Sequence, residues 1–318
     1  GKPLYRRIVE ETLDYVLREM TDESGGFYST QDADSEGEEG KFFIWRPEEI
    51  LEVLGKEDGE RFNAYYDVTI NGNFEGHSIL NVKNPDSEME LLLSRDRAKL
   101  YEAREARVKP DRDEKILTAW NGLMMAAFAE AGAALERQDY TEAAAANARF
   151  LKKEVRDGDR LLRTYKDGSA RLKGYLEDYS FLIEGLLVLH EATFDGEWLQ
   201  EAVALGHAMV LLFWDAPSGQ FYDTGTDHEE LVMRPRDVQD NAIPSGSSMA
   251  ATVLLKLALV TGDGDLDRRA VESLRPMREL MERYPTGAGQ WLCALDFYVS
   301  SPKEIAIVGE PGSSDTSG

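Results

Sequence analysis

The segment Tyr175–Ala192, YLEDYSFLIEGLLVLHEA, is apolar almost all the way round a helix. A helix with this pattern is buried on every side, whereas an amphipathic helix covers other elements and keeps one face in water. The short turn Phe194–Gly196 and the amphipathic segment Glu197–Trp214 follow directly. The stretch therefore predicts a helical hairpin made of an inner helix and an outer helix.

The same alternation recurs along the chain. The other apolar segments are Lys115–Leu135, Pro244–Val260 and Gln290–Val299, and the other amphipathic segments are Tyr140–Val155 and Leu266–Arg283. A long link precedes each apolar helix and a short turn follows it, so the long links gather where the inner helices begin. The pattern predicts an all-α fold, an (α/α)6 toroid of helical hairpins with small β-hairpin insertions on one face.

The expected domain organisation is simple. Residues 1–300 are expected to form one (α/α)6 domain. Residues 301–318 are expected to add a short strand, Glu304–Val308, and a disordered tail that ends in a truncation.

Shorter elements are expected before the first apolar helix. Helices are predicted at Leu4–Met20, Glu48–Leu54, Asp58–Tyr66 and Asp86–Arg107. The aromatic segments Phe27–Tyr28 and Phe42–Trp45 are expected to pair as strands around an acidic loop. A second hairpin is expected to turn at Lys166–Gly168.

The composition is strongly acidic. The 318 residues carry a formal net charge of −24, and the isoelectric point is near 4.6. This charge argues against binding to nucleic acid or to an anionic membrane surface. The apolar stretch Ile116–Leu135 contains Asn121 and Glu130 and is interpreted as a core helix rather than a membrane span. The single cysteine, Cys293, allows no internal disulfide and is expected to be buried. A cytoplasmic protein is the resulting prediction.

Polar residues stand at the starts of three inner helices, where a core helix should be apolar. The three groups are Asp113–Asn121, Gly174–Tyr179 and Asp240–Ser248. Equivalent positions in a ring would bring them to one mouth, where helix N-termini offer N–H groups to oxyanions and hydroxyls. We predict catalytic carboxylates at Asp178, Asp240 and Asp32, and substrate contacts from Asp34, Asp113, Lys115, Trp120, Asn121, Tyr175, Tyr179, Asn241 and Ser245.

Asp178 is the main candidate for proton transfer. It shares a helix face with Tyr175 and Tyr179, and an aspartate beside aromatic rings suits a raised pKa or a bond to a sugar hydroxyl. The tyrosines would stack on a sugar ring, and the acidic loop that carries Asp32 would close the mouth.

Simpler roles for these residues remain open. Asp113 and Asp240 are also suitable helix N-caps, each worth about 1 kcal/mol. The acidic loop matches the opening of a calcium loop, but Phe43 stands where a bidentate glutamate is required, so neither a metal nor a cofactor is expected. No pair of histidines stands at the inner-helix starts, which argues against a two-histidine proton transfer.

Six long motifs, in order along the chain, carry a family resemblance. They are GGFYSTQDADSEGEEGKFFIW (25–45), NGNFEGHSIL (71–80), DEKILTAWNGLM (113–124), YLEDYSFLIEGLL (175–187), SGQFYDT (218–224) and DNAIPSGSS (240–248). Together they resemble the spermatogenesis-associated protein 20 / YyaL family, in which a thioredoxin-like domain precedes a six-hairpin helical domain. The resemblance implies that this chain is the helical part alone, similar in fold to N-acylglucosamine 2-epimerases and six-hairpin glycosidases.

Two functions follow from these observations, and they belong to different classes. The first is a carbohydrate-active or carbohydrate-binding domain, a sugar hydrolase or isomerase that uses carboxylates for acid–base chemistry. The second is a non-catalytic scaffold that serves the thioredoxin-like domain or a protein partner. The sequence leaves open whether the chain is an enzyme.

Overall fold

A computed structural model describes residues 2–158, 160–229 and 232–301. These residues form two compact units. The first unit comprises residues up to Tyr28 and from Lys115 onward, and the second comprises Ser29–Glu114. The two units are described separately below. The expected strand Glu304–Val308 and the expected tail lie outside the described residues.

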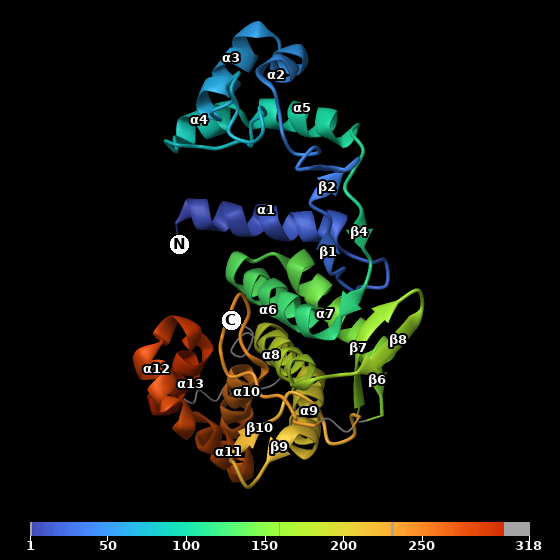
Figure 1. Cartoon of the computed structure of the whole chain (residues 1–318), viewed down its shortest axis with the longest axis vertical. Helices are drawn as coiled ribbons and strands as arrows, with labels where there is room; N and C mark the ends of the chain where they lie inside the picture. Colours follow the sequence, from blue (N-terminus) through green and yellow to red (C-terminus); the bar gives the residue numbers. More distant parts are fainter. Residues whose placement is uncertain (1, 159, 230–231, 302–318) are drawn as a thin grey trace, which may run out of the picture. The chain divides into compact units, whose positions relative to one another are not determined.

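The core of the first unit is a row of apolar helices. In order they are α6 (Thr118–Leu135), α8 (Leu176–Thr193), α10 (Gly246–Thr261) and α13 (Gly289–Val299). α6 packs against α8, α8 against α10, and α10 against α13 (Figure 1). Almost every side chain of α8 and α10 is buried, as their all-round apolar pattern predicts.

An outer layer of helices covers this row. Its members are α7 (Gln138–Glu154), α9 (Gly196–Phe213) and α11 (Gly264–Leu274), which pack on α6, α8 and α10 respectively. The predicted all-α fold of inner and outer helices, the (α/α)6 class, is confirmed. Across the described residues, no helix is long and apolar enough to cross a membrane.

The remaining helices of the first unit are shorter or lie at its edges. They are α1 (Pro3–Glu19), α12 (Arg278–Arg283) and the 3-10 turns Arg275–Met277 and Pro285–Gly287. The single helix expected over Leu266–Arg283 is therefore broken, because Pro276 removes a backbone donor and interrupts the helix. Cys293 is exposed rather than buried, because α13 turns its neighbours Trp291 and Ala294 inward instead.

Short antiparallel strands precede the inner helices. They are β5 (Ile116–Leu117), β6 (Arg156–Asp157), β7 (Arg160–Lys166), β8 (Ser169–Lys173), β9 (Trp214–Asp215) and β10 (Gln220–Phe221). β7 pairs with β5, β6 and β8, and β9 pairs with β10. The predicted hairpin is confirmed, since Asp167 and Gly168 both have positive φ, as its two-residue turn requires.

Glycines allow α6 and α8 to approach each other closely. A Cβ atom at Gly122 would lie 2.5 Å from the carbonyl oxygen of Phe181, and a Cβ atom at Gly185 would lie 2.5 Å from the carbonyl oxygen of Gly122. Real Cβ atoms do not approach backbone atoms this closely, so any side chain here would force the two helices apart.

We therefore expect Gly122→Ala to lower the free energy of unfolding by about 1–3 kcal/mol, because overpacking outweighs the better helix propensity of alanine. Urea unfolding measures the change. Gly264→Ala is the matched control, since a Cβ atom at this helical glycine meets open space. Equal midpoints for the two variants would contradict the close helix contact.

The second unit contains four short helices and small strands. The helices are α2 (Pro47–Leu54), α3 (Lys56–Tyr65), α4 (Ser87–Leu92) and α5 (Ser94–Glu105), and the strands are β1 (Thr30–Gln31), β2 (Asp34–Ser35), β3 (Glu38–Glu39) and β4 (Arg112–Asp113). β1 pairs with β4, and β2 pairs with β3. The long helix expected over Asp86–Arg107 is divided at Leu93, a buried residue between α4 and α5.

The expected pairing of Phe27–Tyr28 with Phe42–Trp45 is wrong. The hairpin is instead formed at the acidic tip by β2 and β3, where Glu36 and Gly37 both have positive φ. Phe27 and Trp45 are each buried, but in separate hydrophobic clusters. Their aromatic character therefore reflects burial in two cores rather than cross-strand pairing.

Candidate functional site

A cavity of about 440 Å³ lies at the N-terminal ends of α8 and α10. Its polar lining consists of Arg163, Glu177, Asp223, Asp237, Gln239 and Asn241, and the rest of its wall is Tyr175, Ile243, Pro244, Ser245 and Gly246. This volume falls within the range of about 300–1,000 Å³ that is usual for small-molecule sites. We call this cavity the α8–α10 cavity.

The two helix starts meet at the wall of the cavity. A Cβ atom at Gly246 would lie 3.0 Å from the backbone nitrogen of Glu177, so only a glycine lets the start of α10 come so near α8. The backbone N–H of Leu176 donates to the carbonyl oxygen of Asp223 at 2.9 Å, which joins the link after β10 to the first turn of α8. Ser245 caps α10, and its hydroxyl accepts from the N–H of Ser248.

Arg163 on β7 connects the cavity wall to a buried carboxylate. Its guanidinium donates to Glu177 Oε1 at 2.8 Å and to Asp178 Oδ2 at 3.2 Å. It also lies 4.7 Å from the centre of the Tyr175 ring. These contacts share the positive charge of Arg163 between two carboxylates, so little of it is left for a ligand.

Asp178 lies behind the cavity wall and is fully buried. Its Oδ1 accepts from the backbone N–H of Ala119 at 3.0 Å, and its Oδ2 accepts from the backbone N–H of Tyr175 at 2.8 Å. Burial raises the pKa of Asp178 to about 7, although Arg163 and the two N–H donors favour the ionised form. The carboxylate thereby joins the first turn of α6 to the first turn of α8.

Asp223 is the titratable group of the cavity wall with the most altered environment. Burial raises its pKa to about 6, and the carboxylates of Asp237 and Glu177 raise it further, while the N–H of Asp237 donates to its Oδ2 at 2.8 Å and favours ionisation. Asp223 can therefore exchange a proton near neutral pH, which is the property that acid–base catalysis requires.

Five of the predicted site residues gather at this cavity. Tyr175, Asn241 and Ser245 line it. Asp178 lies behind Tyr175, as described above, and Asp240 is bonded to Ser245. Asp240 Oδ1 accepts from the N–H of Ser245 at 2.9 Å, and its Oδ2 accepts from the N–H of Gln290 at 2.8 Å. Asp240 thus holds the starts of α10 and α13 together.

Other predicted residues of the first unit lie apart from the cavity lining. Tyr179 is buried, and its hydroxyl accepts from the N–H of Leu161 at 2.9 Å. Asn121 is also buried, and its side chain bonds both the N–H and the carbonyl oxygen of Phe27. Trp120 is 42% exposed on α6, and Lys115 opens the segment before β5.

The remaining predicted residues belong to the second unit. Asp32 and Asp34 are exposed, and Asp32 Oδ1 accepts from the N–H of Asp34 at 3.2 Å. Asp113 lies in β4 and pairs with Thr30, so it does not cap α6, whose N-cap is Leu117. That these residues face a ligand stays a prediction.

Sequence reasoning missed Arg163, Glu177, Asp223 and Asp237 as cavity residues. Glu177 and Asp223 lie within the motifs YLEDYS and SGQFYDT, so their motifs were a usable signal. Arg163 gave no such signal, because it occupies an ordinary strand position in β7. The sequence predicts no histidine pair at this mouth, because no two histidines stand at the starts of inner helices. The structure places one histidine close by, with the His228 ring 5.1 Å from the Tyr175 ring.

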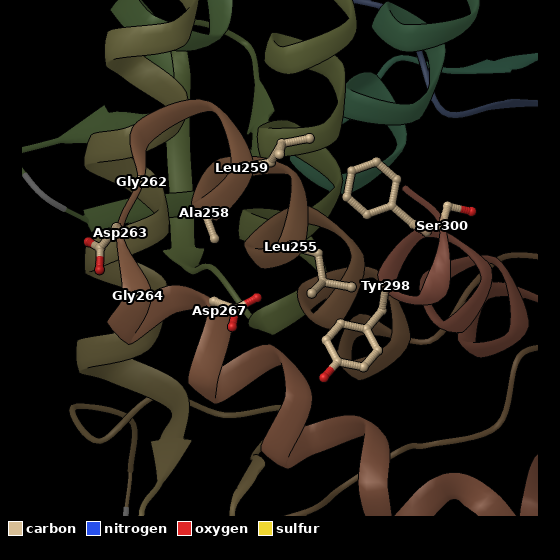
Figure 2. Close-up of a pocket in the computed structure, with 10 residues that line it drawn as sticks. Leu255, Ala258, Leu259, Gly262, Asp263, Gly264, Asp267, Tyr298 and Ser300 are labelled. Carbon is tan, nitrogen blue, oxygen red and sulfur yellow. The ribbon is translucent and has the colours of Figure 1, made fainter. Parts of the chain in front are cut away.

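A second cavity, of about 330 Å³, lies at the opposite end of α10. Figure 2 shows Asp267 and Tyr298 beside Leu255 in this hollow. Its other carboxylate, Asp263, accepts from the N–H groups of Asp265 and Leu266 and so caps α11. Unlike the α8–α10 cavity, it has no amide or guanidinium side chain among the described residues that line it. Within the parts of the chain that the structure describes, no group of three or more His, Cys, Asp or Glu residues is arranged to hold a metal ion.

Curated proteins of known sequence include clear relatives of this chain. Over 99% of its length, the chain is 32% identical to proteins from Rattus norvegicus and Homo sapiens that share one name. The chain is similar to spermatogenesis-associated protein 20. The resemblance carried by the six motifs is thereby confirmed. The chain spans 46% of the length of each spermatogenesis-associated protein 20 relative. No protein-family model matches the chain.

Solved structures similar to this chain include an α-mannanase of Bacteroides thetaiotaomicron and a cellobiose 2-epimerase of Spirochaeta thermophila. The mannanase is 12% identical, with a TM-score of 0.47 over 92% of this chain and 78% of its own. The epimerase is 18% identical, with a TM-score of 0.45 over 54% of this chain and 45% of its own.

Proposed function

We propose that the α8–α10 cavity binds and acts on a sugar or another polyhydroxylated small molecule. The observation that carries the proposal is the combination of Asp223, whose pKa lies near 6, with a second carboxylate and two amide side chains around one cavity. Amides and carboxylates bond hydroxyl groups, and an aspartate with this pKa gains or loses a proton at neutral pH.

Each wall residue has a role in this proposal. Asp223 transfers the proton, and Glu177 is the second carboxylate that sugar hydrolysis usually requires. Gln239 and Asn241 bond ligand hydroxyls, and the half-buried ring of Tyr175 offers a face to a sugar ring.

Asp178 and Asp240 act behind the wall as positioning residues. Asp178 fixes Arg163 and Tyr175, and Asp240 fixes Ser245 at the start of α10. Their oxygens are already bonded to backbone N–H groups, which supports a role in holding the site rather than in touching the ligand.

The scaffold alternative is favoured by the same bonds. If Asp178 and Asp240 serve only to hold helix starts together, the chain is a rigid support, and its partner would be a thioredoxin-like domain in the longer protein. This alternative predicts that no small molecule binds in the α8–α10 cavity.

A sugar panel tests the proposed function. Thermal unfolding is followed with neutral, amino and acidic monosaccharides, and their products are analysed by chromatography. A ligand at about ten times its Kd stabilises the fold by about 1.4 kcal/mol, which raises the melting temperature by about 2–4 °C. Asp267→Asn, in the cavity of Figure 2, should show the same response. A panel that gives neither a shift nor a product would overturn the proposal and favour the scaffold.

A further inference from the structure

The charges of the α8–α10 cavity do not balance. Its wall carries one cation, Arg163, and three carboxylates, Glu177, Asp223 and Asp237. The cation is already bonded to Glu177 and to the buried Asp178. The wall therefore presents an excess of negative charge to any ligand that enters it.

Asp223 and Asp237 carry most of this excess. In the described part of the chain, neither side chain makes an ion pair within 4.0 Å. The neighbouring Arg236 binds Asp215 at 2.5 Å and lies 3.8 Å from the centre of the Tyr222 ring, so its charge acts on Asp223 only from a distance and lowers its pKa slightly. Asp237 and Glu177 each raise the pKa of Asp223 through charge repulsion, in addition to the larger effect of burial.

The helix starts act in the opposite direction. The N-termini of α8 and α10 carry partial positive charges that favour an anion, each equivalent to roughly half an elementary charge. Ser245 already uses its hydroxyl to satisfy one N–H of α10, and Glu177 lies within the first turn of α8, where it offsets that dipole. With Glu177 paired to Arg163, the carboxylates of Asp223 and Asp237 remain, and above about pH 6 their two charges outweigh the two helix ends.

We propose that the α8–α10 cavity selects a ligand that carries an ammonium group, such as an amino sugar, over neutral and anionic sugars of the same skeleton. The ammonium group lies between Asp223 and Asp237, and Gln239 and Asn241 bond the hydroxyls. This inference rests on the proposed function, because it assigns the charge of the ligand in the same site. The inference adds selectivity for the charge of the ligand, which a site for uncharged polyhydroxylated molecules would not need.

Binding of a cation also has a defined pH dependence. The charged groups that act on Asp223 are Glu177 on α8 and Asp237 and Arg236 on the following link, and Arg163 on β7 lines the same cavity. Since Asp223 must be ionised to attract the ammonium group, affinity should rise as the pH increases from about 5 to 7. A neutral sugar should not show this rise.

Four probes of related skeleton test the charge. They are D-glucosamine, N-acetyl-D-glucosamine, D-glucose and D-glucuronate, titrated by calorimetry at pH 6.5, where the glucosamine amine is protonated. We expect D-glucosamine to bind about tenfold more tightly than the two neutral sugars, and D-glucuronate to bind more weakly than either. Raising the ionic strength should weaken D-glucosamine binding and leave D-glucose unchanged.

Two variants test whether the preference for D-glucosamine arises in the α8–α10 cavity. Asp237→Asn should reduce the preference for D-glucosamine to about threefold or less while the affinity for D-glucose stays within about twofold. Asp267→Asn, in the cavity of Figure 2, removes an equal charge elsewhere and should leave all four affinities unchanged.

The outcomes separate the two proposals. Equal affinity for charged and neutral sugars, or a preference for D-glucuronate, overturns the selectivity while the proposed sugar site stands. Loss of the D-glucosamine preference in Asp267→Asn but not in Asp237→Asn also overturns it, because the charge then acts at the other cavity. Failure of all four probes to bind contradicts the proposed sugar site as well.

Discussion

We expect the replacement of Asp178 by asparagine to lower the free energy of unfolding by about 3–5 kcal/mol at pH 7. Both oxygens of the carboxylate accept backbone N–H groups, from Ala119 and from Tyr175, and one of them also faces Arg163. An asparagine turns an NH2 group toward one of these donors and leaves the Arg163 charge without its buried partner. Chemical denaturation of the variant measures the loss.

Glu177→Gln is the matched control for this change. Glu177 is adjacent in sequence and bonds the same arginine, but it is only half-buried, and within the described residues it accepts no backbone N–H group from another helix. Its substitution should change stability by about 1 kcal/mol or less. If the two variants were equally stable, Asp178 would not be the group that joins α6 to α8.

The stability difference also depends on pH, with a sign fixed by the raised pKa. The folded protein holds the Asp178 proton up to about pH 7, whereas an unfolded chain releases it near the ordinary value of 3.8. Between these values the folded state binds more protons, so this group stabilises the fold as the pH falls. The wild type should therefore gain about 2 kcal/mol relative to Asp178→Asn between pH 7 and pH 5. A constant difference across this range would show that Asp178 is already ionised.

Replacing Asp223 by asparagine should lower turnover of a sugar substrate by about 100-fold or more, because the variant loses the group that transfers the proton. The melting temperature should hardly change, since the asparagine oxygen can still accept from the N–H of Asp237. The pH profile of kcat/KM in the wild type should show a limb centred near pH 6, and the variant should lack it. The substrate is the panel sugar that yields a product.

Asp267→Asn again supplies the matched control and should keep both the rate and the limb. A variant of Asp223 that retained the wild-type rate and the same limb would assign the proton transfer to another group. A large fall in its melting temperature would show instead that Asp223 holds the start of α8 through more than its backbone carbonyl.

The fold was largely predictable because the distribution of apolar residues along each helix indicates which of its faces are buried. The apolar segments that contain Leu186 and Leu254 became inner helices, and both side chains are buried. The predictions that were wrong concern local structure. Pro276 broke one expected helix, and aromatic residues such as Phe27 and Trp45 signalled burial without showing which core they enter.

The candidate site was predictable in place but not in detail. The idea that polar inner-helix starts mark a mouth located the cavity walls formed by Tyr175, Asn241 and Ser245. The sequence could not show that the carboxylate oxygens of Asp178 accept hydrogen bonds from backbone N–H groups, because these bonds depend on the distance between α6 and α8. Nor could it bring Asp223 beside Glu177, since these residues lie on different elements that meet only in three dimensions.

A map of backbone amide shifts tests the central claim, that the ligand site is the α8–α10 cavity. Isotope-labelled protein is titrated with D-glucosamine and N-acetyl-D-glucosamine, and two-dimensional amide spectra are recorded. The largest shifts should cluster at the amides of Glu177, Asp223, Asp237 and Gly246 and should saturate with one Kd. Shifts centred instead on Gly262–Asp267, or no saturable shift with either sugar, would contradict it.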